Sequence, residues 1–192
     1  YLWFGTIRGL VRFDGVKFTT FTPRNTPELP ADGIVSLHLH KSGRLWIGTE
    51  KGLASVHDGR WRRHGLNTTW TNRLVRTFSE NADGALCATS FDGSVCRIQG
   101  EEVIELPRPP VNRGQLGYMD PAGTIWVGSK DYFGYQDGPR WVASDLAAKF
   151  TNTFRAIATA RDGGLWVLKQ ARLFKVAGGR VAQSVPLRRP IN

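Results

Sequence analysis

Short segments rich in apolar side chains recur along the whole chain and are separated by glycine-containing turns. Most of them alternate apolar and polar positions with a period of two, as half-buried strands do, and residues 10–13 are an example. Residues 34–40 have little polar interruption, which is typical of a strand covered on both faces. No stretch has the period of an amphipathic helix, and residues 146–150 could form one helical turn at most. The pattern predicts an all-β protein.

The predicted strands follow an order that occurs five times. Each copy reads strand, glycine turn, strand, turn, strand, glycine turn, strand, with an anchor residue on the second strand. The anchors are Trp3, Trp46, Cys87, Trp126 and Trp166, which stand 39–43 residues apart. Four antiparallel strands at this period are typical of a β-propeller blade. We therefore expect the first strand of each blade nearest the axis and the tryptophan of the second strand packed between neighbouring sheets.

The copies divide a single propeller domain, residues 1–192, into repeats of approximately 1–30, 31–70, 71–110, 111–150 and 151–192. The first copy begins inside the motif, so about four and two-thirds blades are expected. A closed ring typically has about four to eight blades. The sequence is therefore predicted to be a fragment of a larger ring, and five blades with an irregular seam are the alternative.

Two copies resemble a known repeat. Residues 2–15 read LWFGTIRGLVRFDG and residues 43–53 read GRLWIGTEKGL, and both are similar to the two-component regulator propeller repeat. The later copies depart from this pattern, with Cys87 at the anchor and Lys169 where the second copy has Thr49.

The resemblance implies a seven-bladed ring in the extracytoplasmic, periplasmic part of a bacterial membrane receptor. The inner parts of such receptors are histidine kinases or diguanylate cyclases. It also implies a propeller that is not itself catalytic and needs no cofactor. Ligand binding or a rearrangement of the blades would act by changing the geometry of the receptor dimer.

The chain is strongly basic, with a formal net charge of +10 and an isoelectric point near 10.2, so it attracts anionic partners. In a blade of this order, the loop between strands two and three and the loop leading to the next blade lie on one face, here called the rim. We expect the rim to bind an anionic small molecule or acidic oligosaccharide, and solvated loop charges are the alternative. The candidate ligand-binding residues are Arg8, Arg24, Lys51, Trp70, Arg73, Arg113, Lys130 and Arg172, and Arg108 and Lys149 are further rim cations.

Trp70 is a candidate because it lies in the polar segment 67–72. An exposed ring in such a loop would stack on a ligand. The alternative is that this tryptophan caps a neighbouring loop.

Two pairs of side chains suggest other chemistry. His38 and His40 share one face of a strand at a spacing used by metal ligands, but no third ligand is suggested, so no metal is predicted and hydrogen-bonded histidines are favoured. Cys87 and Cys96 flank the turn at 92–93. Two buried thiols are favoured there, and a cross-strand disulfide is the alternative.

Several function classes lack their sequence signals. There is no glycosidase carboxylate pair, nucleophile elbow or phosphate-binding glycine loop. No apolar run is long enough to span a membrane. The sequence also lacks a block of consecutive basic residues, which would favour binding to nucleic acid.

Two rival functions remain. A streptogramin-lyase-like enzyme needs a catalytic histidine on the rim, whereas the four histidines fall on the first strand, at the turn after it and near the opposite face. A basic scaffold for nucleic acid or acidic proteins is the other rival. Unpaired blade edges also favour self-association of the chain or receptor dimerisation.

Overall fold

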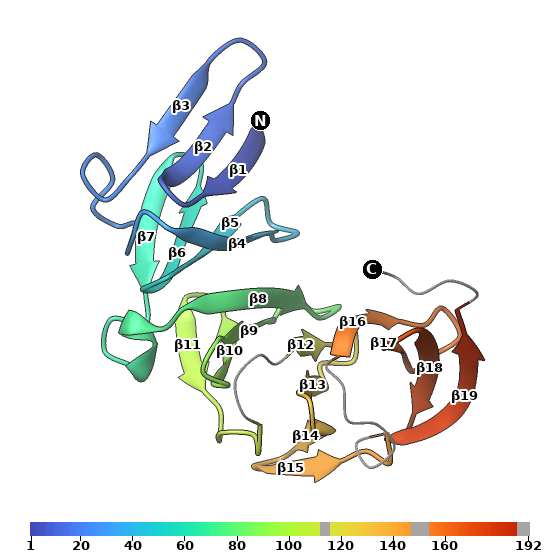
Figure 1. The fold of residues 1–192 in the computed structure, drawn as a ribbon. Coiled ribbons are helices and arrows are strands. Elements are labelled where there is room, and N and C mark those ends of the chain that lie inside the picture. The colour runs from blue at the N-terminus through green and yellow to red at the C-terminus, as the bar shows by residue number, and fades with distance from the viewer. Residues whose placement is uncertain (112–115, 147–153, 188–192) are drawn as a thin grey trace.

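A computed structural model describes residues 1–111, 116–146 and 154–187. In this part of the chain, nineteen strands form five antiparallel sheets that follow one another round an arc (Figure 1). The first sheet has three strands and each of the others has four. The prediction of an all-β propeller with four-stranded antiparallel blades is confirmed. The described residues also contain one short 3-10 helix, Thr69–Asn72, and no helix among them is long and apolar enough to cross a membrane.

The strands of each sheet are consecutive in the chain and pair with their sequence neighbours. The first sheet contains β1 (Leu2–Thr6), β2 (Gly9–Phe13) and β3 (Phe18–Phe21). The second contains β4 (Ile34–Leu39), β5 (Leu45–Thr49), β6 (Gly52–His57) and β7 (Arg60–His64), and the third β8 (Val75–Glu80), β9 (Leu86–Ser90), β10 (Val95–Gln99) and β11 (Glu102–Glu105). The fourth contains β12 (Leu116–Met119), β13 (Ile125–Gly128), β14 (Phe133–Asp137) and β15 (Arg140–Ala143), and the fifth β16 (Phe154–Thr159), β17 (Leu165–Lys169), β18 (Arg172–Ala177) and β19 (Arg180–Pro186).

The first strand of each four-stranded sheet faces the corresponding strand of the next sheet. Thus β4 contacts β8, β8 contacts β12, and β12 contacts β16. In the first sheet, β1 contacts β4 of the second sheet, just as β5 of the second sheet contacts β8 of the third. Strand β1 is therefore the equivalent of β5, the second strand of a four-stranded sheet. Each sheet therefore presents one edge to the inside of the arc, as propeller blades do.

The hydrophobic core consists of layers between successive sheets. Ile47 of β5 packs with Leu10 in the layer shared with the first sheet. Trp46, its neighbour on the same strand, points to the other face and packs with Leu86 of the third sheet. Trp126 lies in the same way between the fourth and fifth sheets. Side chains alternate across a strand, so one motif fills two layers, and the predicted packing between sheets is confirmed for Trp46 and Trp126.

Candidate ligand-binding rim

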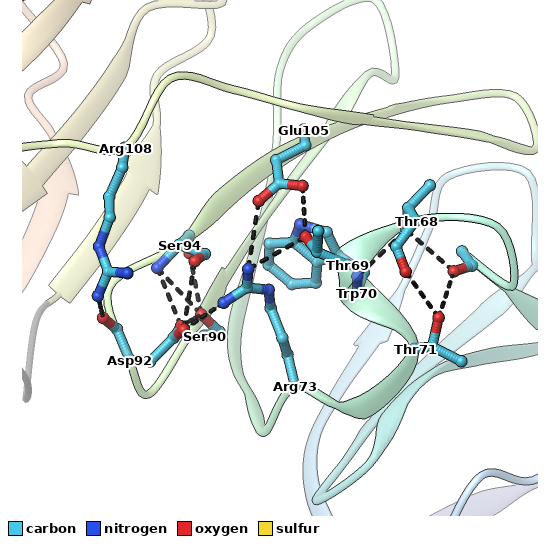
Figure 2. Close-up of polar contacts among 11 residues, drawn as sticks. Thr68, Thr69, Trp70, Thr71, Arg73, Ser90, Asp92, Ser94, Glu105 and Arg108 are labelled. Atoms are coloured by element: carbon cyan, nitrogen blue, oxygen red, sulfur yellow. Dashed lines mark hydrogen bonds and ion pairs between the residues drawn. The ribbon is translucent and has the colours of Figure 1, made fainter.

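In the third sheet the loops predicted to share the rim lie against one another. The backbone N–H of Phe91, in the turn after β9, donates to the carbonyl of Leu74 just before β8 at 2.9 Å. The guanidinium of Arg108, beyond β11, donates to the carbonyl of Asp92 in the same turn (Figure 2). The loop before the first strand, the turn between the second and third strands and the exit of the fourth strand therefore form one surface.

Arg73 is held by two carboxylates on this surface. Figure 2 shows its guanidinium between Asp92 and Glu105, and the Nη2 atom lies 3.3 Å from Glu105 Oε1 and 3.0 Å from Thr69 Oγ1. Burial raises the pKa of Asp92, but hydrogen bonds from Ser90 and Ser94 and the charge of Arg73 outweigh it, so the pKa lies below its ordinary value. Arg73 is therefore paired with two carboxylates of its own sheet, and its role in ligand binding stays a prediction.

Trp70 has no exposed surface. Its side chain is 0% exposed and packs with Trp46, Leu53 and Val75 in the layer between the second and third sheets. Its backbone N–H donates to Thr68 Oγ1 at 3.2 Å, which closes the 3-10 turn around it (Figure 2). The prediction that an exposed Trp70 ring stacks on a ligand is therefore wrong. The ring instead fills the hydrophobic core beneath the loop.

The remaining predicted cations are dispersed over several sheets. Lys51 and Lys130 are exposed in the turns after β5 and β13. Arg172 donates from Nη1 to Ser184 Oγ at 3.1 Å on the neighbouring strand. Arg113 and Lys149 lie outside the described residues.

Arg8 and Arg24 do come together. They line an open pocket of about 400 Å³ with Ile7, Thr22 and Asp32, between the turn after β1 and the loop after β3. Neither guanidinium forms an ion pair with a described residue, although Asp32 contributes one negative charge to the wall. This pocket is the place on the rim where two predicted cations share one cavity and remain free to bind.

The loops that carry these two arginines are ordered by local hydrogen bonds. Asn25 Oδ1 accepts from the Thr22 N–H at 2.8 Å, and Asn25 Nδ2 donates to the Thr20 carbonyl at 2.9 Å. On the other side, Thr6 Oγ1 accepts from the Arg8 N–H at 3.1 Å. Sequence reasoning missed Thr22 and Asn25, although an Asn three residues after a Thr at a strand end is a recognisable turn signal.

His38 lies on β4 and His40 directly follows it, and both point toward Glu80 of β8. His38 Nε2 is 2.9 Å from Glu80 Oε2, and His40 Nε2 is 3.4 Å from Glu80 Oε1. His40 Nε2 also lies 3.0 Å from the Gly84 carbonyl oxygen. The prediction of partly buried, hydrogen-bonded histidines is confirmed, and these contacts join the inner strands of two sheets.

The two cysteines are free and point to opposite faces of the third sheet. Cys87 packs with the fourth sheet, whereas Cys96 packs toward the second. The register explains this arrangement, because Cys87 pairs with Arg97 and Cys96 pairs with Ala88. The prediction of two buried thiols is confirmed, and the disulfide alternative is wrong.

The thiols are therefore expected to be unreactive in the folded protein. Burial raises the pKa of Cys87 to about 12 and raises the pKa of Cys96 well above its ordinary value. At pH 8, an aromatic disulfide reagent should label neither thiol in the native protein and both after unfolding in denaturant without reductant. Absence of labelling after such unfolding would instead indicate a disulfide.

Comparisons with known proteins agree with this architecture. A family model described as two component regulator propeller matches residues 28–51, which supports the resemblance seen in the second copy. A search of curated proteins finds no significant match.

Solved structures similar to this chain include lyases and extracellular domains of two component systems. A streptogramin B lyase has a TM-score of 0.73 at 13% identity over 98% of this chain and 65% of the lyase, and virginiamycin B lyase from Staphylococcus aureus has 0.71 at 14% over 96% and 64%. The extracellular domain of a B. thetaiotaomicron protein described as a hybrid two component system has 0.70 at 16% identity over 96% of this chain and 29% of that domain. The chain thus spans just under two thirds of the lyases and less than a third of that extracellular domain. At these identities, the likeness shows the propeller fold.

Proposed function

We propose that the protein is a ligand-sensing propeller from the periplasmic part of a bacterial membrane signalling receptor and that it has no catalytic activity of its own. The match of residues 28–51 and the likeness to an extracellular two-component domain support this assignment. The observation that carries it is the rim pocket, where Arg8 and Arg24 stand unpaired on ordered loops.

The ligand is anionic, and an acidic oligosaccharide fits the pocket. A guanidinium donates two parallel hydrogen bonds to a carboxylate, and two of them at one cavity select a ligand with closely placed negative charges. The net charge of +10 attracts such a ligand from a distance. Binding across the loops of the first sheet would then bias the receptor between signalling states.

A streptogramin-lyase-like enzyme is the second candidate, favoured by the TM-scores of 0.71 and 0.73. The described histidines speak against it. His38 and His40 contact Glu80, and His64 is buried against Trp46, where burial lowers its pKa. His57 lines a groove at the face opposite the rim. None of them lines the pocket of Arg8 and Arg24.

The reading frame that encodes these residues tests the sensor assignment directly. We expect it to encode further propeller repeats, a membrane span and a kinase or cyclase in the same polypeptide. A frame that lacks a membrane span and a signalling domain would contradict the sensor and leave a binding module or a lyase.

The rim pocket is tested by charge-neutral variants. Arg8→Gln combined with Arg24→Gln is expected to weaken the binding of trigalacturonate, measured by calorimetry at physiological salt, by at least about tenfold at the rim site, because charge-assisted hydrogen bonds are lost. The matched control is Lys17→Gln combined with Arg60→Gln, which removes the same charge from two exposed positions outside the predicted rim. Equal weakening of trigalacturonate binding in both double variants would show that the overall positive charge of the protein, and not the rim pocket, attracts the ligand. Steeply salt-dependent binding of duplex DNA by the wild type would favour the nucleic-acid scaffold instead.

A further inference from the structure

In each of the first four sheets one position faces the layer shared with the next sheet, and the fifth sheet has a register equivalent. It is the residue paired with the anchor across the second and third strands of a blade. The pairs are Trp3 with Arg12, Trp46 with Ser55, Cys87 with Arg97, Trp126 with Tyr135 and Trp166 with Lys175. These side chains are therefore register equivalents, and what each one contacts can be compared between layers.

In two layers this side chain bridges to the following sheet. Arg97 Nη2 donates to the Gly123 carbonyl of the fourth sheet at 3.0 Å. Tyr135 lies against Gly179 of the fifth sheet, so closely that a Cβ there would come within 2.9 Å of its ring. Both layers are thus filled at the face opposite the rim.

Arg12 makes no such bridge. Its side chain forms no hydrogen bond or ion pair with a described residue, and its Nε atom is buried without a partner. The guanidinium carbon lies instead 4.6 Å from the ring centre of Tyr1, 5.7 Å from that of Phe21 and 5.9 Å from that of Trp3. No described residue accepts a hydrogen bond from this guanidinium, and Arg12 lines the groove described next, so its guanidinium can donate to an acceptor that enters there.

An aromatic groove lies beside Arg12, between the first and second sheets. Trp3, Phe21 and Trp61 come from β1, β3 and β7 and contact one another, with ring centres 4.8–6.4 Å apart. All three are only partly buried, so ring surface remains available. The cavity measures about 380 Å³, which is within the range of small-molecule sites.

Polar groups stand at the edge of this groove. Thr19, His57 and Asp58 line it together with the turns at Gly43 and Gly59, which lie at the end of the second sheet away from the rim. The Asp58 side chain is 87% exposed and forms no ion pair with Arg12. The charge of Arg12 acts on Asp14, which is exposed in the turn after β2 and does not line the groove. The groove therefore combines aromatic walls with an unpaired cation.

We propose that the aromatic groove is a second binding site, separate from the rim pocket, and that it takes a saccharide unit bearing a carboxylate, such as a hexuronate. The apolar C–H face of a pyranose ring stacks on aromatic side chains, and the carboxylate supplies the acceptor that Arg12 lacks. A purely apolar ligand would fill the groove but leave the arginine unpaired. The net charge of +10 favours the acidic saccharide over a neutral one. This inference does not depend on the sensor assignment.

The test uses tryptophan fluorescence, because Trp3 and Trp61 form part of the walls. The variant Arg8→Gln with Arg24→Gln, whose rim pocket is disabled, is titrated with trigalacturonate and with neutral maltotriose. We expect a saturable change with trigalacturonate and binding at least about tenfold weaker for maltotriose.

Three further substitutions in that background locate the site. Arg12→Gln should weaken trigalacturonate binding at least about tenfold. Arg60→Gln should leave it unchanged, since Arg60 is exposed on β7 and does not line the groove. Trp61→Phe, which keeps an aromatic ring for packing, should weaken binding without changing thermal unfolding greatly, so that loss of the fold is not mistaken for loss of the site.

The proposal is overturned if the rim-disabled protein binds neither saccharide, if it binds maltotriose as tightly as trigalacturonate, or if Arg12→Gln binds like its parent. The first result leaves the rim pocket intact as a hypothesis, because that pocket is tested in the protein with both arginines present. Conversely, unchanged binding in the rim variant with loss in Arg12→Gln supports the groove and contradicts the rim pocket.

Discussion

Replacing Trp70 by alanine is expected to lower the free energy of unfolding by about 3–5 kcal/mol, the usual cost of emptying a fully buried tryptophan site. The ring is 0% exposed and fills the layer between the second and third sheets beside Trp46 and Leu53. Removing it would leave a cavity that the surrounding strands cannot close. Urea unfolding followed by circular dichroism measures the loss.

A neighbouring residue provides the control for Trp70. Leu66 lies in the same loop region but is 58% exposed, so Leu66→Ala should change stability by no more than about 0.5 kcal/mol. If Trp70→Ala were as stable as the wild type yet lost ligand binding, the ring would be a binding platform after all.

The position of Trp70 shows a limit of sequence reasoning. Its neighbours are polar, and local composition therefore predicts an exposed loop. In the structure, those polar side chains serve the turn itself, with Thr68 and Thr71 bonding to backbone atoms within the segment. The tryptophan is then free to point inward, and the hydrophobic layer that receives it comes from strands distant in the sequence.

Charge on the rim shows the same limit. The sequence places basic residues in the correct loops, because the strand order fixes which turns share a face. It does not reveal that Asp92 and Glu105, which lie 19 and 32 residues after Arg73, return to pair with it. Arg8 and Arg24 stay unpaired because Asp32, the carboxylate that lines their pocket, forms an ion pair with neither guanidinium. Pairing of surface charges depends on loop geometry, which the repeat pattern does not encode.

The fold itself is well predicted from the sequence, because the signal is repeated. Alternating apolar positions, glycine turns and a constant spacing each indicate the same four-stranded unit, so an irregular copy does not obscure the architecture. The repeat pattern does not predict details of strand pairing that depend on a shift of one residue. Cys87 and Cys96 look like partners across a turn, but their strands are offset by one position, and side chains one position apart lie on opposite faces of a sheet.

Glycine in the central motif permits close approach between sheets, and the third sheet departs from this rule. A Cβ at Gly48 would lie 2.8 Å from the carbonyl oxygen of Val75 on the next inner strand, and Gly5 faces Ile34 in a similar way. In the third sheet the equivalent residue is Thr89. The glycine stands instead on the facing strand as Gly117, where an added Cβ would clash with Thr89 Cγ2. One of the two facing positions must therefore be small.

Gly117→Ala is accordingly expected to lower the free energy of unfolding by about 2–3 kcal/mol through overpacking, measured by urea unfolding. The backbone of Gly117 is not in the left-handed region, so alanine adds a clash and no conformational strain. Thr89→Gly alone should cost about 1 kcal/mol, because it removes the hydrogen bond between the Thr89 and Thr77 hydroxyls and adds a flexible residue to β9.

The double variant decides whether the two positions compensate for each other. The three heavy atoms nearest to an alanine Cβ at position 117 all belong to Thr89, so Thr89→Gly removes the clash and restores the arrangement of the second sheet, with glycine on the motif strand. The combined variant should be more stable than the sum of the single effects by about 2 kcal/mol, which is within the range of coupling energies for residues in contact. If the two changes in the free energy of unfolding were simply additive, the contact between positions 89 and 117 would not be the cause of the destabilisation. Gly117 would then be needed for another reason, because substitutions that disturb one shared contact do not give additive effects.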